Sequence, residues 1–368
     1  MPRLIWCLLI FFSAVRLPAF SLLTYNVAGN GTTNWSTNTA QVQAIGRQVA
    51  YLQPDVITFN EIPRTNTWQM ANFVTAFLPG YFLATNSGSD GFIRSVVASR
   101  HPIVREKSWL SSADLAPYGF TNADFTRDLF EAEINVPGWT QHLHVFVTHL
   151  KAFADATSSA RRAAEASAIS NFFVNGFLTT NASHPYVLSG DLNEDVAKPP
   201  NNSGHPIERL VNAATGLQLT TPTNPVSGKH FSYSARATLN ERIDYILPGA
   251  LLASNIAGGQ VFRTDVLTPL PSGLQALDGE TASDHLPVLL IFRNPYDTPF
   301  RLTSIAFSDH VVRLNWASVS QRVYRVEGSS NFLVWTPLAT NLVASTTNFG
   351  WTGTVSAPLQ FFRLERAP

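Results

Sequence analysis

The chain has 368 residues, of which 45% are apolar and only 14% are charged. This length and composition predict a folded protein with a sizeable core, divided into one large domain and one small one. The 25 basic and 25 acidic residues cancel, which excludes a global field that would steer the protein to polyanions or anionic membranes. Any recognition of phosphate must therefore be local.

The first 20 residues have the pattern of a secretory signal peptide. Arg3 provides a positive charge, and an apolar run follows from Leu4 to Val15. The run is too short to span a membrane, and Ala19 offers a small residue for cleavage. We therefore expect residues 1–20 to be removed near Ala19 and the protein to be secreted or periplasmic.

Residues 21–293 mix strands and helices without a strict alternation. Short apolar runs that end in turn residues predict strands at 21–26, 55–60, 81–85, 92–98, 103–110, 129–136, 142–148, 186–188, 242–247 and 286–292. Apolar residues at helical spacing predict helices at 68–78, at 155–178, at 206–214 and in the segment that follows Asn38 as a candidate cap. This mixture favours mixed sheets that are covered by helices on their outer faces.

The last part of the chain has a different pattern. Residues 294–299 are rich in turn formers and predict a linker. Beyond them, apolar residues alternate with polar ones, as in Tyr324-Arg-Val326, and no helical segment is found. The period of two predicts that residues 300–368 form a small β-sandwich of the fibronectin III or immunoglobulin type.

Polar side chains follow the predicted strands of the large domain, at the points where the strands end. In Gly-Asp191-Leu-Asn193, two polar side chains stand two residues apart and share one face of an extended backbone. Such a pair could hold a water molecule or a metal-bound oxygen. Further strand ends carry Asn26, Glu61, His149 and the pair Asp284-His285.

Asp244 lies within a predicted strand, in Arg-Ile-Asp244-Tyr-Ile. A buried carboxylate without a partner is costly, so Asp244 needs one. A histidine is the natural partner, and either His285 or His149 would serve.

The ordered set of these motifs resembles the endonuclease/exonuclease/phosphatase superfamily, which includes deoxyribonuclease I, exonuclease III, neutral sphingomyelinases and inositol polyphosphate 5-phosphatases. The similarity spans about residues 21–293. It is carried by Thr-Tyr-Asn26, Asn60-Glu61, Ser99-Arg-His-Pro102, Thr148-His149-Leu, Gly190-Asp191-Leu-Asn193, Arg242-Ile-Asp244 and Ser283-Asp284-His285-Leu-Pro287.

The resemblance implies an α+β fold, a four-layer αββα sandwich in which two mixed sheets lie face to face, followed here by the small all-β sandwich. It also implies cleavage of a phosphoester with Mg²⁺, for which Mn²⁺ is a possible substitute. Small sandwiches of this kind resemble modules appended to exported bacterial enzymes. For residues 300–368 we consider binding to a surface or a glycan, or stabilisation of the preceding domain.

Residue by residue, the resemblance assigns Glu61 as the main metal ligand, with Asn26 and Asp284 close to the ion. It implies that Asp191 orients or deprotonates the attacking water. Asn193 would hold that water or a phosphate oxygen. Mg²⁺ prefers few carboxylates and several waters, which suits this set.

The resemblance also assigns the acid–base groups. It pairs His285 with Asp244 and lets His149 donate to the phosphate or to its leaving oxygen. Two histidines, one of them supported by a carboxylate, suit proton transfer near neutral pH. In the deoxyribonuclease I branch the first histidine pairs with a glutamate, and Asp90 is the nearest candidate here by order along the chain.

Arg127 matches the position of a phosphate-contacting arginine in the deoxyribonuclease I branch. A surface arginine paired with Asp128 or Glu131 is the alternative.

The substrate expected from this resemblance is extracellular nucleic acid, cleaved by in-line attack of water. Within the superfamily, a phospholipid hydrolase similar to sphingomyelinase or a phosphomonoester hydrolase is the alternative. A binding or adhesion protein without activity is the alternative from another class, and the complete set of polar residues argues against it. We expect no stable protein partner.

Overall fold

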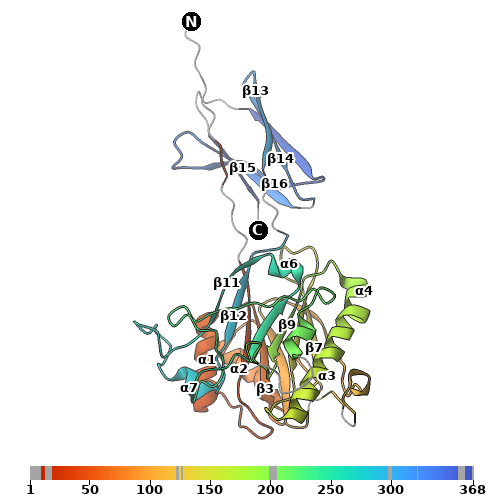
Figure 1. The fold of residues 1–368 in the computed structure, drawn as a ribbon. Helices are drawn as coiled ribbons and strands as arrows, with labels where there is room; N and C mark the ends of the chain where they lie inside the picture. The colour runs from red at the N-terminus through yellow and green to blue at the C-terminus, as the bar shows by residue number, and fades with distance from the viewer. Residues whose placement is uncertain are drawn as a thin grey trace. The chain divides into compact units, whose positions relative to one another are not determined.

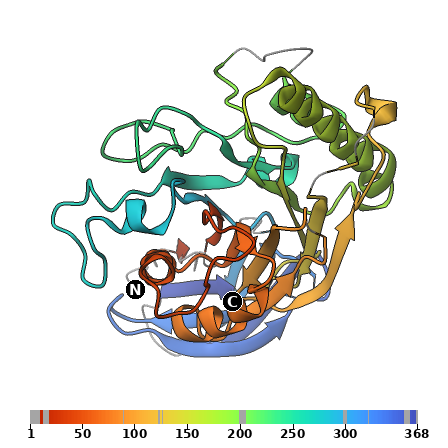
Figure 2. The same ribbon diagram turned by 90° about the horizontal axis from the view of Figure 1, so that it is seen from below.

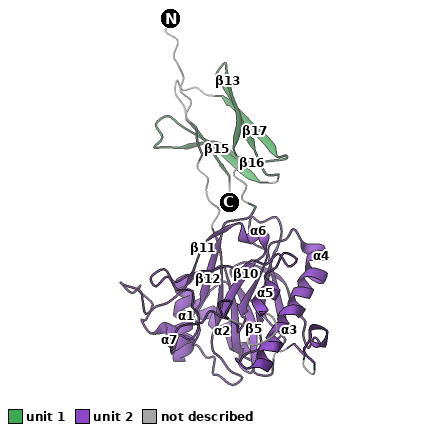
Figure 3. Cartoon of the chain, viewed as in Figure 1, with its two compact units in different colours: residues 1–18, 296–368 green, residues 19–295 purple. Residues whose placement is uncertain are grey.

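The computed structural model describes residues 10–12, 19–88, 90–121, 124–125, 127–198, 205–296, 301–320, 322–354 and 361–366. The chain divides into two compact units, one of residues 19–295 and one of residues 1–18 together with 296–368 (Figure 3). Residues 297–299 of the predicted linker, and most of the predicted signal peptide, lie outside the described residues.

The larger unit contains two mixed sheets (Figure 1). The six-stranded sheet has the order β11 (Ile256–Val261), β12 (Val288–Phe292), β2 (Phe20–Asn26), β3 (Val56–Pro63), β5 (Ile93–Ser99) and β4 (Phe82–Thr85). The five-stranded sheet has the order β10 (Asp244–Pro248), β9 (Tyr186–Asp191), β8 (Leu143–His149), β7 (Leu129–Ile134) and β6 (Ile103–Trp109). Most neighbouring strands are antiparallel, whereas β2 with β3 and β8 with β9 are parallel.

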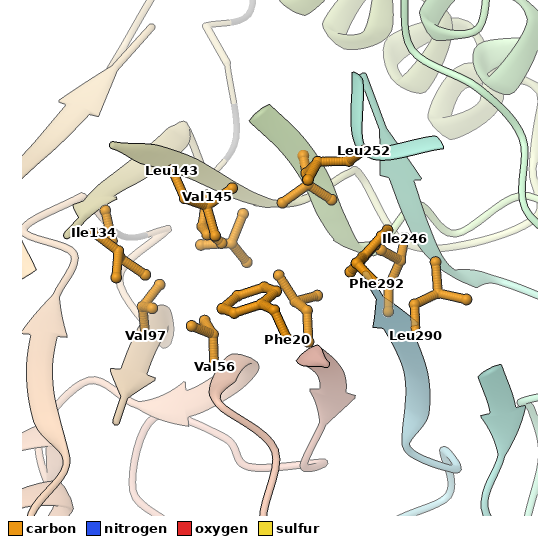
Figure 4. Packing of buried hydrophobic residues seen from close by; sticks show 14 of the residues in the cluster. Phe20, Val56, Val97, Ile134, Leu143, Val145, Ile246, Leu252, Leu290 and Phe292 are labelled. Carbon is orange, nitrogen blue, oxygen red and sulfur yellow. The ribbon is translucent and has the colours of Figure 1, made fainter. Parts of the chain in front are cut away.

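The inner faces of the two sheets form one apolar layer. Figure 4 shows Phe20, Val56 and Val97 of the six-stranded sheet beside Leu143 and Val145 of the five-stranded sheet. Side chains alternate along a strand, so the residues between these point to the opposite faces. Both faces of the central strands are buried, which explains why their sequences are nearly continuous apolar runs.

Helices cover the two outer faces and lie on opposite sides of the strands (Figure 2). One outer layer contains α1 (Ala40–Leu52), the 3₁₀ turn η1 (Thr67–Gln69) and α2 (Met70–Phe77), with α7 (Asp278–Ala282) against α1. The other contains α3 (Ala156–Phe172), a π turn (Phe173–Phe177), α4 (Leu178–Asn181) and α5 (Pro206–Leu210). The 3₁₀ turn η2 (Ala116–Tyr118) and α6 (Ala250–Ala253) complete the unit.

The predicted α+β four-layer sandwich is therefore confirmed, with small corrections. The cap of α1 is Thr39 rather than Asn38, because the Thr39 side chain accepts the hydrogen bond from the Val42 amide. The edge strand β11 was not predicted, since its two glycines and its half-exposed position leave no apolar pattern.

The described residues of the smaller unit form strands and loops without a helix. One sheet has the order β1 (Ile10–Phe12), β18 (Phe361–Arg366), β15 (Val323–Ser329) and β16 (Thr336–Val343). The other has the order β13 (Leu302–Ser308), β14 (Val311–Ala317) and β17 (Asn348–Thr354). Alternate residues of β14, β15 and β18 share one core around Trp316 and Tyr324, as the period of two predicts. Within the described residues, no helix is long and apolar enough to cross a membrane.

The layer between the sheets should dominate the stability of the larger unit. Leu22 is fully buried in this layer, so Leu22→Ala should lower the free energy of unfolding by about 2–5 kcal/mol. Leu277→Ala is the matched control, because that leucine is 62% exposed, and it should change the stability by less than about 0.5 kcal/mol. Urea denaturation measures both, and equal losses would contradict this account of the core.

Candidate active site

The strand ends that carry the predicted polar residues meet at one edge of the sandwich. The register places Asn26 beside Asn60 in the six-stranded sheet. It places Asp191 between His149 and Asp244 in the five-stranded sheet. Asp284 and His285 lie just before β12, and an isolated bridge joins His285 to Tyr233. The chain thus brings together side chains that are far apart in sequence.

Several of these residues line a cavity of about 460 Å³. Its lining includes Glu61, Asp191, Asn193, Asp284 and His285, together with polar and aromatic residues of the neighbouring loops. A cavity of this size with convergent polar groups has the character of a ligand site.

Asn26 is buried and connects two carboxylates of the cavity lining that belong to different sheets. Its amide nitrogen donates to Glu61 Oε1 (3.0 Å) and to Asp191 Oδ2 (2.9 Å). Its amide oxygen accepts from the Ala28 backbone. The nitrogen of Asn26 therefore faces both carboxylates and holds them side by side.

Glu61 projects from a bulge in β3. The register between β3 and β5 shifts between Phe59 and Ile62, and Glu61 has a φ of 62°. A bulge re-aims a side chain out of the regular strand, and backbone strain of this kind is found at functional positions. Burial raises the pKa of Glu61, and the hydrogen bond from Asn26 opposes that rise.

Asp191 stands at the centre of the cluster. Its Oδ1 accepts from the Asn193 amide (2.8 Å), and its Oδ2 lies 3.4 Å from His149 Nε2 and 3.8 Å from His285 Nε2. Burial raises the pKa of Asp191 to about 7, although the charge of His285 opposes the rise. A carboxyl group with this pKa can exchange a proton near neutral pH.

His149 is buried, and neither of its ring nitrogens has a hydrogen-bond partner. Its Nε2 lies 3.9 Å from Glu61 Oε1, on the side of the cavity. Burial lowers the pKa of His149 well below its usual value, and Arg127 lowers it further. The ring is therefore neutral at neutral pH, and its nitrogens are buried polar atoms without a hydrogen-bond partner.

His285 and Asp244 form a buried pair. His285 Nδ1 lies 2.8 Å from Asp244 Oδ2, so of the two histidines that the sequence allowed, the structure pairs His285 with this carboxylate. Burial opposes the positive ring, but Asp244 and Asp191 outweigh it and raise the pKa of His285 to about 10. The ring of Tyr233 packs against His285 at 4.9 Å between centroids.

Two further predicted residues border the same cavity. Asn193 has a φ of 51°, and its side-chain nitrogen donates to the Leu150 carbonyl (3.1 Å). The Asp284 carbonyl accepts from the Ala235 amide. The Asp284 carboxylate contributes to the negative field on Glu61.

Arg127 reaches this edge, but its contacts correct two predictions. Its Nε donates to Asp90 Oδ2 (2.9 Å), and its Nη1 donates to the Leu150 carbonyl (2.9 Å). Asp90 is therefore the partner of Arg127 and not of His149, and the alternative pairing of Arg127 with Asp128 or Glu131 is wrong too. The reason is that the loop before β5 directs Asp90 to the guanidinium, while His149 faces Asp191.

Asn60 is a structural residue of this site that the sequence placed in the Asn60-Glu61 motif without a role of its own. Its side-chain oxygen accepts from the Asp191 amide (3.1 Å), and its nitrogen donates to the Thr148 carbonyl (3.2 Å). Gly190 allows this approach, since a Cβ there would lie 2.0 Å from the Thr148 oxygen. The signal in the sequence was a polar residue at the end of a buried strand, directly before Glu61.

The charge balance of the cavity suits a divalent cation. Among the described residues, no arginine or lysine forms an ion pair with Glu61, Asp191 or Asp284. Glu61, His149 and Asp191 offer ligand atoms within 4.8 Å of one another. Hard carboxylate oxygens beside an unpartnered histidine fit such an ion, with Glu61 the most accessible donor.

The chain belongs to the endonuclease/exonuclease/phosphatase family. The model of that family matches residues 23–310, which is well over half of the chain. Its members depend on a divalent metal, in agreement with the cluster around Glu61, and the chain is a phosphoester hydrolase. Among curated proteins, none matches this sequence.

Solved structures of the family share the fold of the larger unit. An endonuclease/exonuclease/phosphatase family protein from Leptotrichia buccalis is 18% identical, covers 74% of this chain and 99% of its own, and gives a TM-score of 0.50. The endonuclease/exonuclease/phosphatase from Bacteroides vulgatus is 14% identical, with coverage of 74% and 98% and a TM-score of 0.51. The TDP2 of D. rerio, complexed with a single strand DNA product, is 14% identical, with coverage of 74% and 98% and a TM-score of 0.50.

The pair of His285 and Asp244 predicts a pH dependence of stability in metal-free protein. In the folded state the pKa of His285 is about 10, against an ordinary 6.5. The stabilisation is therefore complete below pH 6.5 and is lost as the pH rises to about 10. The pKa of Asp191 rises from 3.8 to about 7, so this group adds a separate stabilisation that is lost as the pH rises from 3.8 to about 7.

Urea denaturation in EDTA, repeated from pH 6 to 10, measures this effect. Asp244→Asn should flatten the loss of stability between pH 6.5 and 10, because it removes the partner that keeps His285 charged. Equal slopes in the wild type and the variant would contradict the assignment.

Proposed function

We propose that this protein is an exported, Mg²⁺-dependent phosphodiesterase that hydrolyses nucleic acid outside the cytoplasm. The observation that carries the proposal is the group of carboxylates around Glu61 and Asp191, which lacks a compensating arginine or lysine in the described residues and adjoins two histidines of opposite charge state. Family membership supports phosphoester hydrolysis.

Glu61 would hold the cation, with Asp284 and Asn26 beside it. A bound divalent cation offsets negative charge on the phosphate oxygens and favours ionisation of a nearby water. Asn26 keeps Glu61 next to Asp191, so the ligand and the proton acceptor remain in one place. Mg²⁺ is the ion expected for carboxylate donors that leave room for water and phosphate.

Asp191 orients the attacking water and accepts its proton, because its pKa of about 7 suits transfer near neutral pH. The backbone N–H of Asn193 donates to the Asp191 carboxylate and holds it in place. Charged His285, whose Nε2 lies 3.8 Å from Asp191 Oδ2, donates a hydrogen bond to the phosphate. Neutral His149 offers a ring N–H to the leaving oxygen.

Nucleic acid is the proposed substrate class, because the family contains nucleases and because D. rerio TDP2, which shares this fold, is complexed with a DNA product. The net charge of zero implies that contacts near the cavity carry the affinity rather than a basic surface. Arg127 remains a candidate contact for a phosphate, since its guanidinium is fixed at the edge of the site by Asp90.

Activity measurements test this proposal. With Mg²⁺ the purified protein should cleave oligonucleotides or nick plasmid, EDTA should abolish cleavage, and Mg²⁺ or Mn²⁺ should restore it. Asp191→Ala and His149→Ala should each lower kcat by about 10²- to 10⁴-fold. Glu61→Gln should raise the Mg²⁺ concentration needed for activity.

His142→Ala is the matched control, because that histidine is 43% exposed and is not part of the cavity lining, and it should retain full activity. Release of choline phosphate from sphingomyelin, or of inorganic phosphate from monoesters, without cleavage of nucleic acid would contradict the proposed substrate.

Export is supported by the charged start and apolar run of residues 1–20. Cleavage near Ala19 would remove β1, which pairs with β18 through Ile10–Phe12. In a bacterial host that expresses the whole chain, the exported product should begin near Phe20 on N-terminal sequencing. Leu8→Arg should keep the protein in the cytoplasm, and export of this variant with an intact N-terminus would refute the assignment.

A further inference from the structure

Phe153 has an unusual position at the wall of the cavity. Its side chain is 71% exposed, and its backbone has a φ of 82°. Residues other than glycine adopt such a φ rarely, and a bulky side chain makes it a strained conformation. A strained backbone that presents a large apolar ring to solvent needs a structural reason.

A buried arginine holds this conformation. The Nη1 of Arg162 donates to the carbonyls of Lys151 (2.9 Å) and Phe153. The same guanidinium donates through Nε (3.0 Å) and Nη2 (2.8 Å) to Glu194 Oε2. Arg162 is 2% exposed, so this ion pair is shielded from water and breaking it is costly.

The same segment is tied to the catalytic loop. The Leu150 amide donates to the Asp191 carbonyl (3.0 Å), and the Leu150 carbonyl accepts from Asn193 Nδ2 (3.1 Å). Glu194, which anchors Arg162, follows Asn193 directly in the sequence. The backbone that carries Phe153 is thus tied to the loop that holds the groups proposed to act on the phosphate.

A free cation accompanies the ring. Lys151 Nζ lies 4.8 Å from the centroid of Phe153. In the described part of the chain, Lys198 and Arg162 of the cavity wall are paired with Glu241 and Glu194, whereas Lys151 forms no ion pair. A ring and an unpaired ammonium group together match a nucleobase and its neighbouring phosphate.

We propose that Phe153 is a stacking platform for an unpaired base of a single-stranded nucleic acid, and that Lys151 contacts a phosphate next to that base. This inference rests on the proposed function, whose substrate it narrows. In a duplex both faces of each base are covered by neighbouring bases, so only an unstacked base offers a face to the ring. An acyl chain fits poorly here, because Glu194, Asp195, Lys198 and Glu241 line the same cavity.

Steady-state cleavage with Mg²⁺ tests the inference on two strands of equal length. One is an ordinary single strand, and the other carries abasic sites beside the cleaved bond. Phe153→Leu should raise KM about tenfold on the ordinary strand and less than twofold on the abasic strand. Phe153→Trp should have the KM of the wild type, because stacking needs an aromatic ring and a large aliphatic side chain does not replace it.

Phe82→Leu is the matched control, since Phe82 is 47% exposed on the edge strand β4, and its kinetics should match the wild type. Thermal melting of each variant separates a loss of recognition from a loss of folding. Equal losses on both strands, or a loss that Phe153→Trp does not restore, would overturn the stacking role.

A binding measurement separates this inference from the proposed function. The fluorescence of a single strand that contains 2-aminopurine should be quenched when the strand binds to the wild type. The Phe153→Leu variant should bind that strand about tenfold less tightly. Ring-dependent quenching without cleavage would reject the proposed activity and keep the platform. Quenching that Phe153→Leu leaves unchanged would reject the platform even if cleavage is observed. Phe153→Leu that weakens binding only to sphingomyelin vesicles would reject it too.

Discussion

The hydrogen bonds of Asn60 are the constraint on which this site depends. They join the bulged strand β3 to β8 and β9 of the facing sheet through the Asp191 amide and the Thr148 carbonyl. Apolar packing between sheets has no direction, so it cannot by itself fix polar atoms of two sheets to within a fraction of an ångström. Glu61 belongs to one sheet and Asp191 to the other, and chemistry between them requires that degree of positioning. The amides of Asn60 and Asn26 supply it.

The site is stable only because the apolar layers around it stabilise the fold. Asp191 and Asp244 are buried carboxylates, and the charged ring of His285 faces both of them. Burial of such groups, together with the strained backbone of Glu61, costs free energy that the apolar layers must offset. That balance also explains the opposite states of the two histidines. His285 has a carboxylate on each side and keeps its proton, whereas burial lowers the pKa of His149, with Arg127 adding to the effect, and that ring is neutral.

Most strands of the two sheets and most site residues could be predicted from the sequence. Buried strands have apolar sequences, and polar residues at their ends are therefore easy to recognise. The burial cost of Asp244 left two histidines as its possible partner, the family resemblance pointed to His285, and the structure pairs Asp244 with that ring. Asp90, the nearest candidate by order for the partner of His149, pairs with Arg127 instead, because order along the chain says nothing about the path of a loop. The exposure of Phe153 was missed for a related reason. Its strain depends on hydrogen bonds from Arg162, a residue on a helix whose sequence looks like an ordinary solvated face.

Chemistry and recognition arise from different parts of this fold, yet the two are mechanically connected. Strand ends supply the groups that act on a phosphoester, and they follow from a sandwich that many phosphoesterases share. Loops supply the cavity wall and therefore the choice of substrate. Here the loop that carries Phe153 is bonded through Arg162 to Glu194, the residue next to Asn193. A displacement of that loop must break the hydrogen bonds from Arg162 to the Lys151 and Phe153 carbonyls, or carry with it Arg162 and Glu194, the neighbour of Asn193. Substrate that contacts the cavity wall at Phe153 correctly is therefore favoured when Asp191, the proton acceptor, is in position.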